Sequence, residues 1–306
     1  MTNAEAVAPR PQLAAADHRL GLPLIIGAAL LWSIGGVIAR FISVADSWTI
    51  VFWRAGFAAA FLLAFMLWRD GPRGTLALIR NMGLPGLGVA CCFGIASTSF
   101  VVALAHTTVA NILLMQAGAP LIAALLAGAL FGERVSAVTW AAIIAVIAGV
   151  AVMVSSSLTG AVSPVGDGLA LLITALFATA TVITRRHAEV RMTPAVFLGT
   201  AMAAIFSANL AGGLAVGGAD LAWLFLFGAV NLGLGLALYV TGARLVPAAV
   251  ATLVSTIEPV LAPVWVWLVH GEVPGGRTLL GGAIIFAALL FHFLAELRRQ
   301  RMGLRP

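Results

Sequence analysis

Ten stretches of roughly 20 apolar residues follow one another along this chain, separated by short joints rich in Gly, Pro, Ser, Asp and Arg. A helix of about 20 residues, at ~1.5 Å rise per residue, spans the ~30 Å hydrocarbon core of a bilayer. Because lipid cannot satisfy the open edge of a sheet, we expect an all-α polytopic membrane protein. The stretches predict ten transmembrane helices at about 22–41, 49–68, 84–105, 110–131, 136–156, 168–184, 194–215, 221–243, 247–269 and 278–296.

The composition supports a membrane class. Charged residues make up 9% of the 306 residues and hydrophobic ones 62%, whereas a soluble domain carries about 25% charged residues because its surface faces water. No joint is long enough to bury a core of its own. We expect a disordered cytoplasmic tail at 1–19, a first half at 20–157, a linker at 158–165, a second half at 166–297 and a basic cytoplasmic tail at 298–306.

The arginines predict the orientation. All seventeen basic residues are Arg; with the N-terminus in the cytoplasm, fourteen of them lie on the cytoplasmic side. Only Arg277 lies on an outer joint, and Arg40 and Arg54 lie within helices. Cytoplasmic joints of membrane proteins carry the excess of positive charge. We therefore expect both termini inside, in a bacterial cytoplasmic membrane, and no nucleic-acid partner, because the basic residues form no compact patch.

The two halves repeat one pattern: a proline within a helix, a run of small and aliphatic residues, and a Gly-Glu pair at the joint. Since five helices is an odd number, the second half enters the membrane upside down relative to the first. Inverted repeats give many secondary transporters two related conformations, with the substrate bound near the midplane. The matched residues stand 139 positions apart, namely Pro120 and Pro259, Gly132 and Gly271, Glu133 and Glu272, and Phe100 and Tyr239.

This pattern resembles the EamA repeat of the drug/metabolite transporter superfamily, and it occurs twice over about residues 22–297. The resemblance implies ten helices in two inverted five-helix repeats around a central cavity, and export without ATP. The first helix resembles the YddG-type branch, which exports aromatic and other amino acids, in the residues Leu31, Trp32, Ser33, Gly36, Ile38 and Arg40.

Glu258 is the sharpest candidate for a functional residue. It lies near the middle of the stretch 247–269 and stands where the first half has Ala119. A charge at that depth costs about 2.5–3.5 kcal/mol on insertion scales, and Pro259 leaves the carbonyl of Ser255 without its helical partner. Glu258 is expected to bind a substrate ammonium group or to exchange a proton. The alternative is a protonated carboxyl that hydrogen-bonds a neighbouring helix.

Other intramembrane residues have two interpretations each. Arg54 and Arg40 either attract a substrate carboxylate or extend to the interface, and Trp32 either contacts substrate or packs. Polar groups such as Gln116 and Asn231 either tie helices together or bind ligand. The candidates for the substrate pathway are Glu258, Arg54, Arg40, Trp32, Gln116, Tyr239, Phe100 and Asn231, and those for the hinge and repeat motif are Pro120, Pro259, Gly132, Glu133, Gly271 and Glu272.

Together these features predict a secondary transporter, not an enzyme, that exports aromatic and other neutral amino acids by alternating access. The sequence contains no HExxH, CxxC, GxSxG or Walker motif, so we expect no metal, no cofactor and no ATP. The expected partners are an amino acid or related metabolite, membrane lipid and, as the candidate coupling ion, protons. The alternative is a multidrug or metabolite exporter, including a nucleotide-sugar-type carrier. A channel is disfavoured because the joints are too short to build a filter.

Overall fold

The computed structural model describes residues 15–131, 137–158, 163–187, 189–242, 245, 254–255 and 257–301. These residues form helices and joints, with no strand among them. The first half contains α1 (Ala15–Ser33), α2 (Gly35–Phe41), α3 (Ser47–Asn81), α4 (Gly83–Leu104), α5 (Val109–Gln116), α6 (Ala119–Phe131) and α7 (Ala137–Leu158). The second contains α8 (Pro164–Arg186), α9 (Thr193–Ala208), α10 (Gly218–Phe225), the π-helix η1 (Leu226–Leu234), α11 (Gly235–Gly242), α13 (Ile257–His270) and α14 (Gly276–Arg301).

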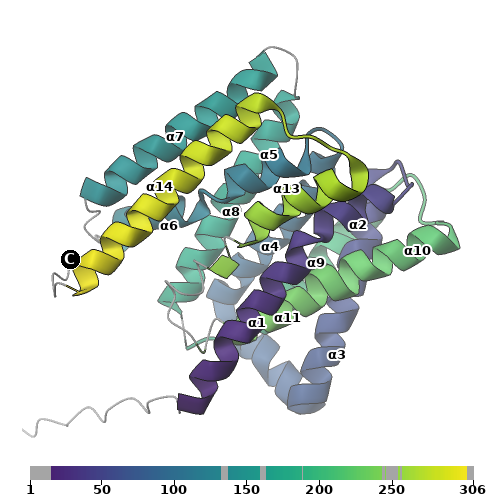
Figure 1. The fold of residues 1–306 in the computed structure, drawn as a ribbon. Helices are drawn as coiled ribbons and strands as arrows, with labels where there is room; N and C mark the ends of the chain where they lie inside the picture. Colours follow the sequence, from purple (N-terminus) through teal and green to yellow (C-terminus); the bar gives the residue numbers. More distant parts are fainter. Residues whose placement is uncertain are drawn as a thin grey trace, which may run out of the picture.

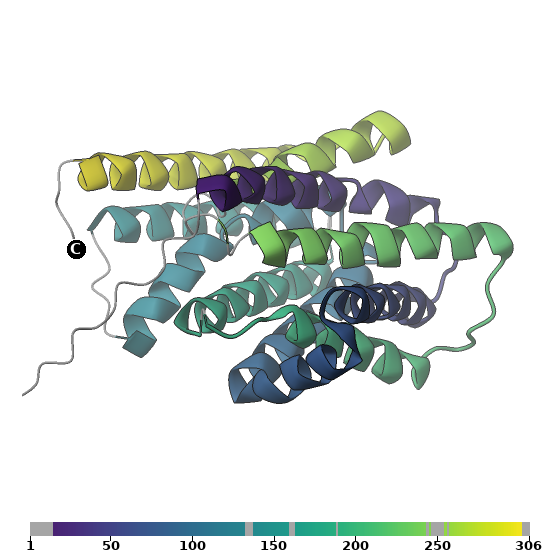
Figure 2. The same ribbon diagram turned by 90° about the horizontal axis from the view of Figure 1, so that it is seen from below.

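The helices confirm the predicted fold class. Eight helical segments of the described chain are long and apolar enough to cross a membrane, and α9 and α13 are two shorter apolar helices. Counted along the chain, each half contributes five. α7 and α14 run side by side, and α1 begins at the end of the bundle where α14 finishes (Figures 1 and 2).

The predicted end segments are only partly described. α1 begins at Ala15, so its first turn lies within the segment 1–19 that we predicted as a tail. Residues 1–14, 159–162 and 302–306 lie outside the described residues. The repeat-motif residues Gly132 and Glu133 lie outside them as well.

The two halves interlock rather than lie side by side. Extensive helix contacts join helices that occupy the same place in each half, α3 with α9 and α7 with α14. Other contacts come in mirrored pairs. The packing of α4 on α8 is mirrored by α11 on α1, that of α4 on α9 by η1 on α3, and that of α5 on α8 by α13 on α1. This pairing is what a two-fold relation between two inverted halves requires.

Three of the spans are irregular within the membrane. The first is broken at Ile34, between α1 and α2, and the fourth at 117–118, between α5 and α6. A π-helical segment, η1, interrupts the eighth. We had predicted uninterrupted stretches at 22–41 and 110–131. Glycine has low helix propensity, and Gly35 and Gly118 lie at the two breaks. Inverted-repeat transporters place their substrate sites at such interrupted helices.

Close backbone packing holds the interlocked halves together. A Cβ atom added at Gly199 of α9 would collide with the carbonyl oxygen of Ala90 in α4, and one added at Gly281 of α14 would collide with that of Gly149 in α7. Small residues allow helices in a membrane to approach this closely, which increases their van der Waals contact.

We therefore expect Gly199→Ala and Gly281→Ala each to lower the free energy of unfolding by about 1–3 kcal/mol, because the added methyl group forces the helices apart. Chemical denaturation of the purified protein in detergent measures the change. Gly168→Ala is the matched control, because a Cβ at Gly168 of α8 meets no atom within 4 Å. An equal loss of stability in that control would show that close packing is not the cause.

The start of α3 is fixed by Asp46. Its carboxylate accepts hydrogen bonds from the backbone N–H groups of Trp48 (3.1 Å) and Thr49 (3.3 Å) and from the Thr49 hydroxyl (2.7 Å). It also accepts one from the backbone N–H of Gly212 (3.0 Å), in the joint between α9 and α10. The Thr49 hydroxyl, with the backbone N–H groups, holds the pKa of Asp46 below its ordinary value, although burial acts in the opposite direction.

This cap makes part of the stability dependent on pH. A carboxyl whose pKa is lowered on folding stabilises the fold above its unfolded pKa of about 3.9, and this contribution is lost as pH falls through the folded pKa. Asp46→Ala should lower the free energy of unfolding by about 1 kcal/mol at neutral pH. Thermal unfolding at a series of pH values should show the gap to the native protein narrowing in acid. A gap that is constant down to the lowest pH would contradict this assignment.

Candidate functional site

Arg54 of α3 lies in the interior with its side chain held on several sides. It is 6% exposed. Its guanidinium carbon lies 4.2 Å from the ring centre of Phe227 and 5.5 Å from that of Phe100. Nη1 donates to the hydroxyl (2.9 Å) and the carbonyl (3.4 Å) of Ser97. Nε is buried and has no hydrogen-bond partner in the described part of the chain. These contacts fix the orientation of the guanidinium, and its Nε–H donor stays without a partner in the described part of the chain.

Glu258 lies in the first turn of α13. Its side chain is partly exposed. Its charge and that of Arg54 act on each other through space. The two side chains are not in contact, because the ion pairs found among the described residues are Arg40–Glu272 and Arg191–Asp70. The interior therefore holds an arginine from the first half and a glutamate from the second, with no ion pair between them.

The two repeat prolines lie at helix starts. Pro259 and Pro120 each lie in the first turn of a short helix, α13 and α6. For Pro120, which follows the turn at 117–118, this position removes no helical hydrogen bond, because the N–H of a first-turn residue has no partner in the helix. We had placed Pro259 inside a helix running over 247–269. α13 begins at Ile257, and Val254 and Ser255 before it are helical as well, but Thr256 and residues 246–253 lie outside the described residues, so this placement of Pro259 stays a prediction.

Trp32 and Tyr239 form an aromatic pair in the interior. Their ring centres are 5.2 Å apart. The Tyr239 hydroxyl is hydrogen-bonded with Ser255, and Tyr239 lies within electrostatic range of Glu258. The indole Nε1 of Trp32 is buried without a partner among the described residues. It lies against Gly235 of α11, where an added Cβ would collide with it.

These side chains lie at similar depths. Trp32 is nine residues before the end of α2, Arg54 eight after the cap of α3, and Glu258 twelve before the end of α13. At about 1.5 Å per residue these separations are roughly 12–18 Å, close to half of a ~30 Å hydrocarbon core. Both halves contribute to this interior cluster, which consists of Trp32, Arg54, Ser97, Phe100, Phe227, Tyr239 and Glu258.

Two other candidates lie at the helix breaks. Asn231 of η1 donates from its side-chain amide to the carbonyls of Leu31 and Trp32, at the end of α1. It therefore supplies a partner for backbone groups that the break releases. Gln116 is the last residue of α5, and its side chain is partly exposed. The substrate roles of both residues stay predictions.

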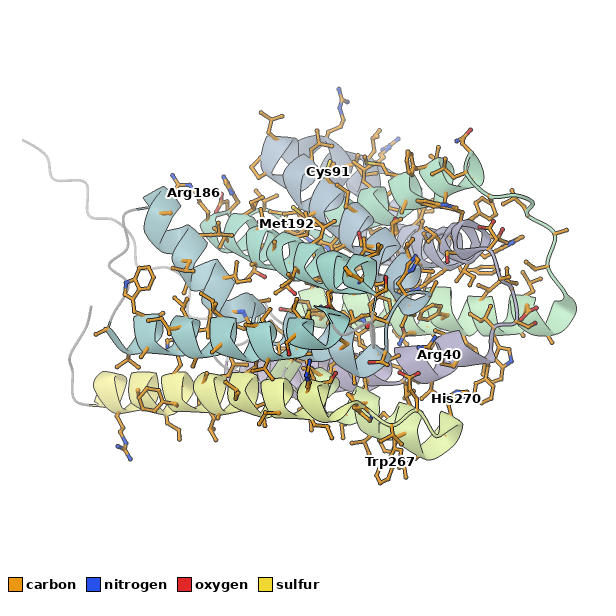
Figure 3. The ribbon with its side chains drawn as sticks, turned by 90° about the horizontal axis from the view of Figure 1, so that it is seen from above. Arg40, Cys91, Arg186, Met192, Trp267 and His270 are labelled. Atoms are coloured by element: carbon orange, nitrogen blue, oxygen red, sulfur yellow. The ribbon has the colours of Figure 1, made fainter. Side chains whose placement is uncertain are left out.

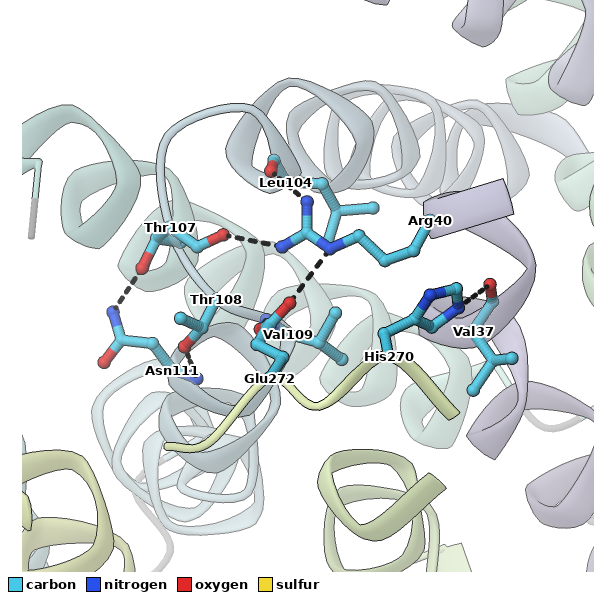
Figure 4. A network of polar contacts seen from close by, with 9 residues as sticks. All are labelled: Val37, Arg40, Leu104, Thr107, Thr108, Val109, Asn111, His270 and Glu272. Carbon is cyan, nitrogen blue, oxygen red and sulfur yellow. Dashed lines mark hydrogen bonds and ion pairs between the residues drawn. The ribbon is translucent and has the colours of Figure 1, made fainter. Parts of the chain in front are cut away.

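Arg40 lies apart from the interior cluster, in the last turn of α2. Its Nε donates to Glu272 (3.0 Å), and its Nη1 and Nη2 donate to the carbonyls of Leu104 (3.0 Å) and Thr107 (3.4 Å). Glu272 also accepts from the backbone N–H of Val109 (3.1 Å), at the start of α5 (Figure 4). The sequence suggested an interfacial arginine or a substrate contact. The structure gives Arg40 a partner in the opposite half.

The Gly-Glu pair has a local structural cause. Gly271 ends α13 with a φ of 67°, and its N–H donates to the carbonyl of Trp267 (2.9 Å). Glycine adopts this left-handed conformation without steric cost, so it commonly terminates helices. Glu272, the next residue, thereby reaches both Arg40 and the first turn of α5.

A second buried contact joins the halves nearby. The side-chain amide of Asn111 in α5 donates to the Thr107 hydroxyl (3.1 Å) and to a carboxylate oxygen of Asp167 in α8. Asn111 is 0% exposed and Asp167 is 3% exposed. We call Arg40, Thr107, Asn111, Asp167 and Glu272 the polar latch. Arg40 and His270 lie at one end of the bundle, and Arg186 lies at the other (Figure 3).

The sequence interpretation did not include Asp167, Ser97 or Phe227 in a site. Asp167 had a usable signal, since it is an acidic residue directly before the apolar stretch 168–184. Ser97 and Phe227 had none, because a serine and a phenylalanine within an apolar helix are ordinary packing residues. Their proximity to Arg54 comes from tertiary packing alone.

We expect Arg40→Gln and Glu272→Gln each to lower the free energy of unfolding by about 1–3 kcal/mol, because each leaves a charge-assisted hydrogen bond unmade. The double variant should lose little more than either single one, since both remove the same interaction. Denaturation of the four proteins in detergent measures the coupling. Asp70→Asn, which breaks the separate Arg191–Asp70 pair, should add independently to Glu272→Gln. Full additivity of Arg40→Gln and Glu272→Gln would refute the latch.

Two inverted, interlocked five-helix halves with charged and aromatic groups between them define the architecture of a membrane transporter. The model of the EamA-like transporter family matches residues 19–155 and, a second time, residues 164–294. The chain therefore belongs to the EamA-like transporter family, within the drug/metabolite transporter superfamily.

Solved structures support the fold. One of those similar to this chain, titled "Crystal structure of protein", has 20% sequence identity and a TM-score of 0.65, and the match covers 92% of this chain and 99% of that one. At this identity the likeness shows the fold alone. No curated protein matches the sequence.

Proposed function

We propose that this transporter exports aromatic and other neutral amino acids across the bacterial cytoplasmic membrane by alternating access. The observation that carries the proposal is the interior cluster, which holds an arginine, a glutamate and aromatic rings at mid-membrane depth. A small solute that carries a carboxylate, an ammonium group and an apolar side chain fits this cluster. The resemblance of the first helix to the YddG-type branch supports the same cargo.

The polar latch supports alternating access. Two inverted halves with one sequence pattern have two related arrangements, each closed at one end. The latch joins the halves at the end of the bundle where α2 finishes. With both termini in the cytoplasm, as the arginine distribution predicts, that end faces outward. The Arg191–Asp70 ion pair joins the two halves at the opposite end, so each end of the bundle has a contact that must break in one of the two arrangements.

The second candidate is a multidrug or metabolite exporter with a different cargo. A phosphate-bearing cargo would favour cations from both halves, whereas the arginine of the interior cluster comes from the first half. A cationic drug would leave Arg54 without a function at the site. These arguments favour amino acids over either alternative.

The experiment is transport by the purified protein in liposomes. We expect labelled Phe, Met and Thr to cross faster than in empty liposomes. A nucleoside diphosphate sugar and a lipophilic cation serve as the alternative cargoes. Rates at the empty-liposome level across a broad amino-acid panel would remove the amino-acid assignment, and movement of an alternative cargo would replace it.

Glu258→Gln should slow amino-acid transport at least tenfold while the protein keeps its native elution profile and melting behaviour. The carboxylate is removed, but the side chain keeps its size. Glu189→Gln is the control, since Glu189 is exposed in the joint before α9. If protons are the coupling ion, Glu258→Gln should also flatten the pH profile of transport. Rates and a pH profile equal to those of the native protein would leave Glu258 as a helix-packing residue.

A further inference from the structure

We infer that Arg54 and Glu258 form a two-charge subsite that binds one zwitterion, with the carboxylate at Arg54, the ammonium at Glu258 and the side chain against the Trp32–Tyr239 pair. The inference rests on the proposed function and deepens it. It assigns a charge to each end of the site, and it predicts which analogues of an amino acid the transporter rejects.

The geometry of Arg54 fits a carboxylate subsite. The rings of Phe227 and Phe100 and the hydroxyl of Ser97 fix the plane of the guanidinium. Nε remains buried without a partner in the described chain, although a buried donor normally has one. An arginine presents two parallel donors along one edge, which match the two oxygens of a carboxylate. A carboxylate on that edge would satisfy the donor that the protein leaves free.

Glu258 supplies the complementary charge from the other half. Where this protein uses charges to join elements, the atoms are in contact, at 3.0 Å in Arg40–Glu272 and 2.8 Å in Arg191–Asp70. Arg54 and Glu258 form no such ion pair with each other. A zwitterion placed between them would pair both charges and bring no net charge into the membrane. A substrate with one charge would leave either Arg54 or Glu258 unpaired, which is costly at that depth.

The aromatic pair indicates where the substrate side chain would lie in the site. Tyr239 lies near Glu258 and 5.2 Å from Trp32 between ring centres. The substrate side chain would therefore lie on the Glu258 side of the subsite. Aromatic faces bind apolar and aromatic side chains. The indole N–H of Trp32, which has no partner among the described residues, adds one donor for a hydroxyl or thioether.

The test is competition against labelled phenylalanine in liposomes containing the full chain. Phenylalanine amide lacks the carboxylate, and 3-phenylpropanoate lacks the ammonium group. For the native protein we expect both analogues to compete at least tenfold more weakly than phenylalanine. Arg54→Gln should lose most of its discrimination against the amide and keep that against phenylpropanoate. Glu258→Gln should show the reverse pattern.

Arg73→Gln is the matched control, since Arg73 is an exposed arginine on the same helix as Arg54. It should keep the native ratios. If Arg54→Gln fails to fold, Arg54→Lys keeps the charge without the two-donor edge and should weaken phenylalanine binding, measured as ligand-induced thermal stabilisation in detergent. Native discrimination in both charge variants, with amino-acid transport intact, would overturn the subsite alone. Absence of amino-acid transport by the native protein would overturn the proposed function.

Discussion

The hydrocarbon core of a bilayer contains no water to solvate a charged side chain, so the protein or a ligand must supply polar or charged partners for it. In the described part of the chain, Arg54 and Asp167 are the charged residues that are buried. Asp167 accepts a hydrogen bond from Asn111 of the other half, and the guanidinium of Arg54 lies against the Phe227 ring of the other half. Half-buried Arg40 follows the same rule with Glu272. The electrostatic requirement thus joins the two halves at each of these positions.

The same low polarity explains how the broken helices persist. A break releases backbone carbonyls, and each one left without a partner in lipid costs several kcal/mol. Asn231 bonds to the carbonyls of Leu31 and Trp32, and Trp265 donates to the Ser33 hydroxyl beside them. These contacts come from η1 and α13, in the second half. The irregular first span therefore depends on the second half for its stability, and the interior cluster depends on the irregular spans for its space.

The sequence was sufficient for the membrane class and the repeat, because hydropathy and spacing are local properties. Arg54 was also found, since an arginine within an apolar stretch is visible without a structure. Its surroundings were not, because Phe227 lies 173 positions away and no pattern marks it. The pairing of Arg40 with Glu272 across 232 positions was missed for the same reason. The helix breaks at Ile34 and 117–118 were not predicted, because hydropathy averaged over a window of residues does not depend on backbone geometry.

If the protein alternates between two states, as proposed, the mirrored helix crossings affect the balance between those states. The α4–α9 crossing meets at Gly199, and its mirror, α3 with η1, meets at Gly228 against the backbone of Arg54. In a carrier built from inverted halves, the two crossings exchange environments when the molecule switches. A substitution that loosens the α4–α9 crossing would favour one of the two states. The equivalent substitution at the α3–η1 crossing would favour the other state. Substitutions at the two glycines would then offset each other in conformational preference while adding in lost stability.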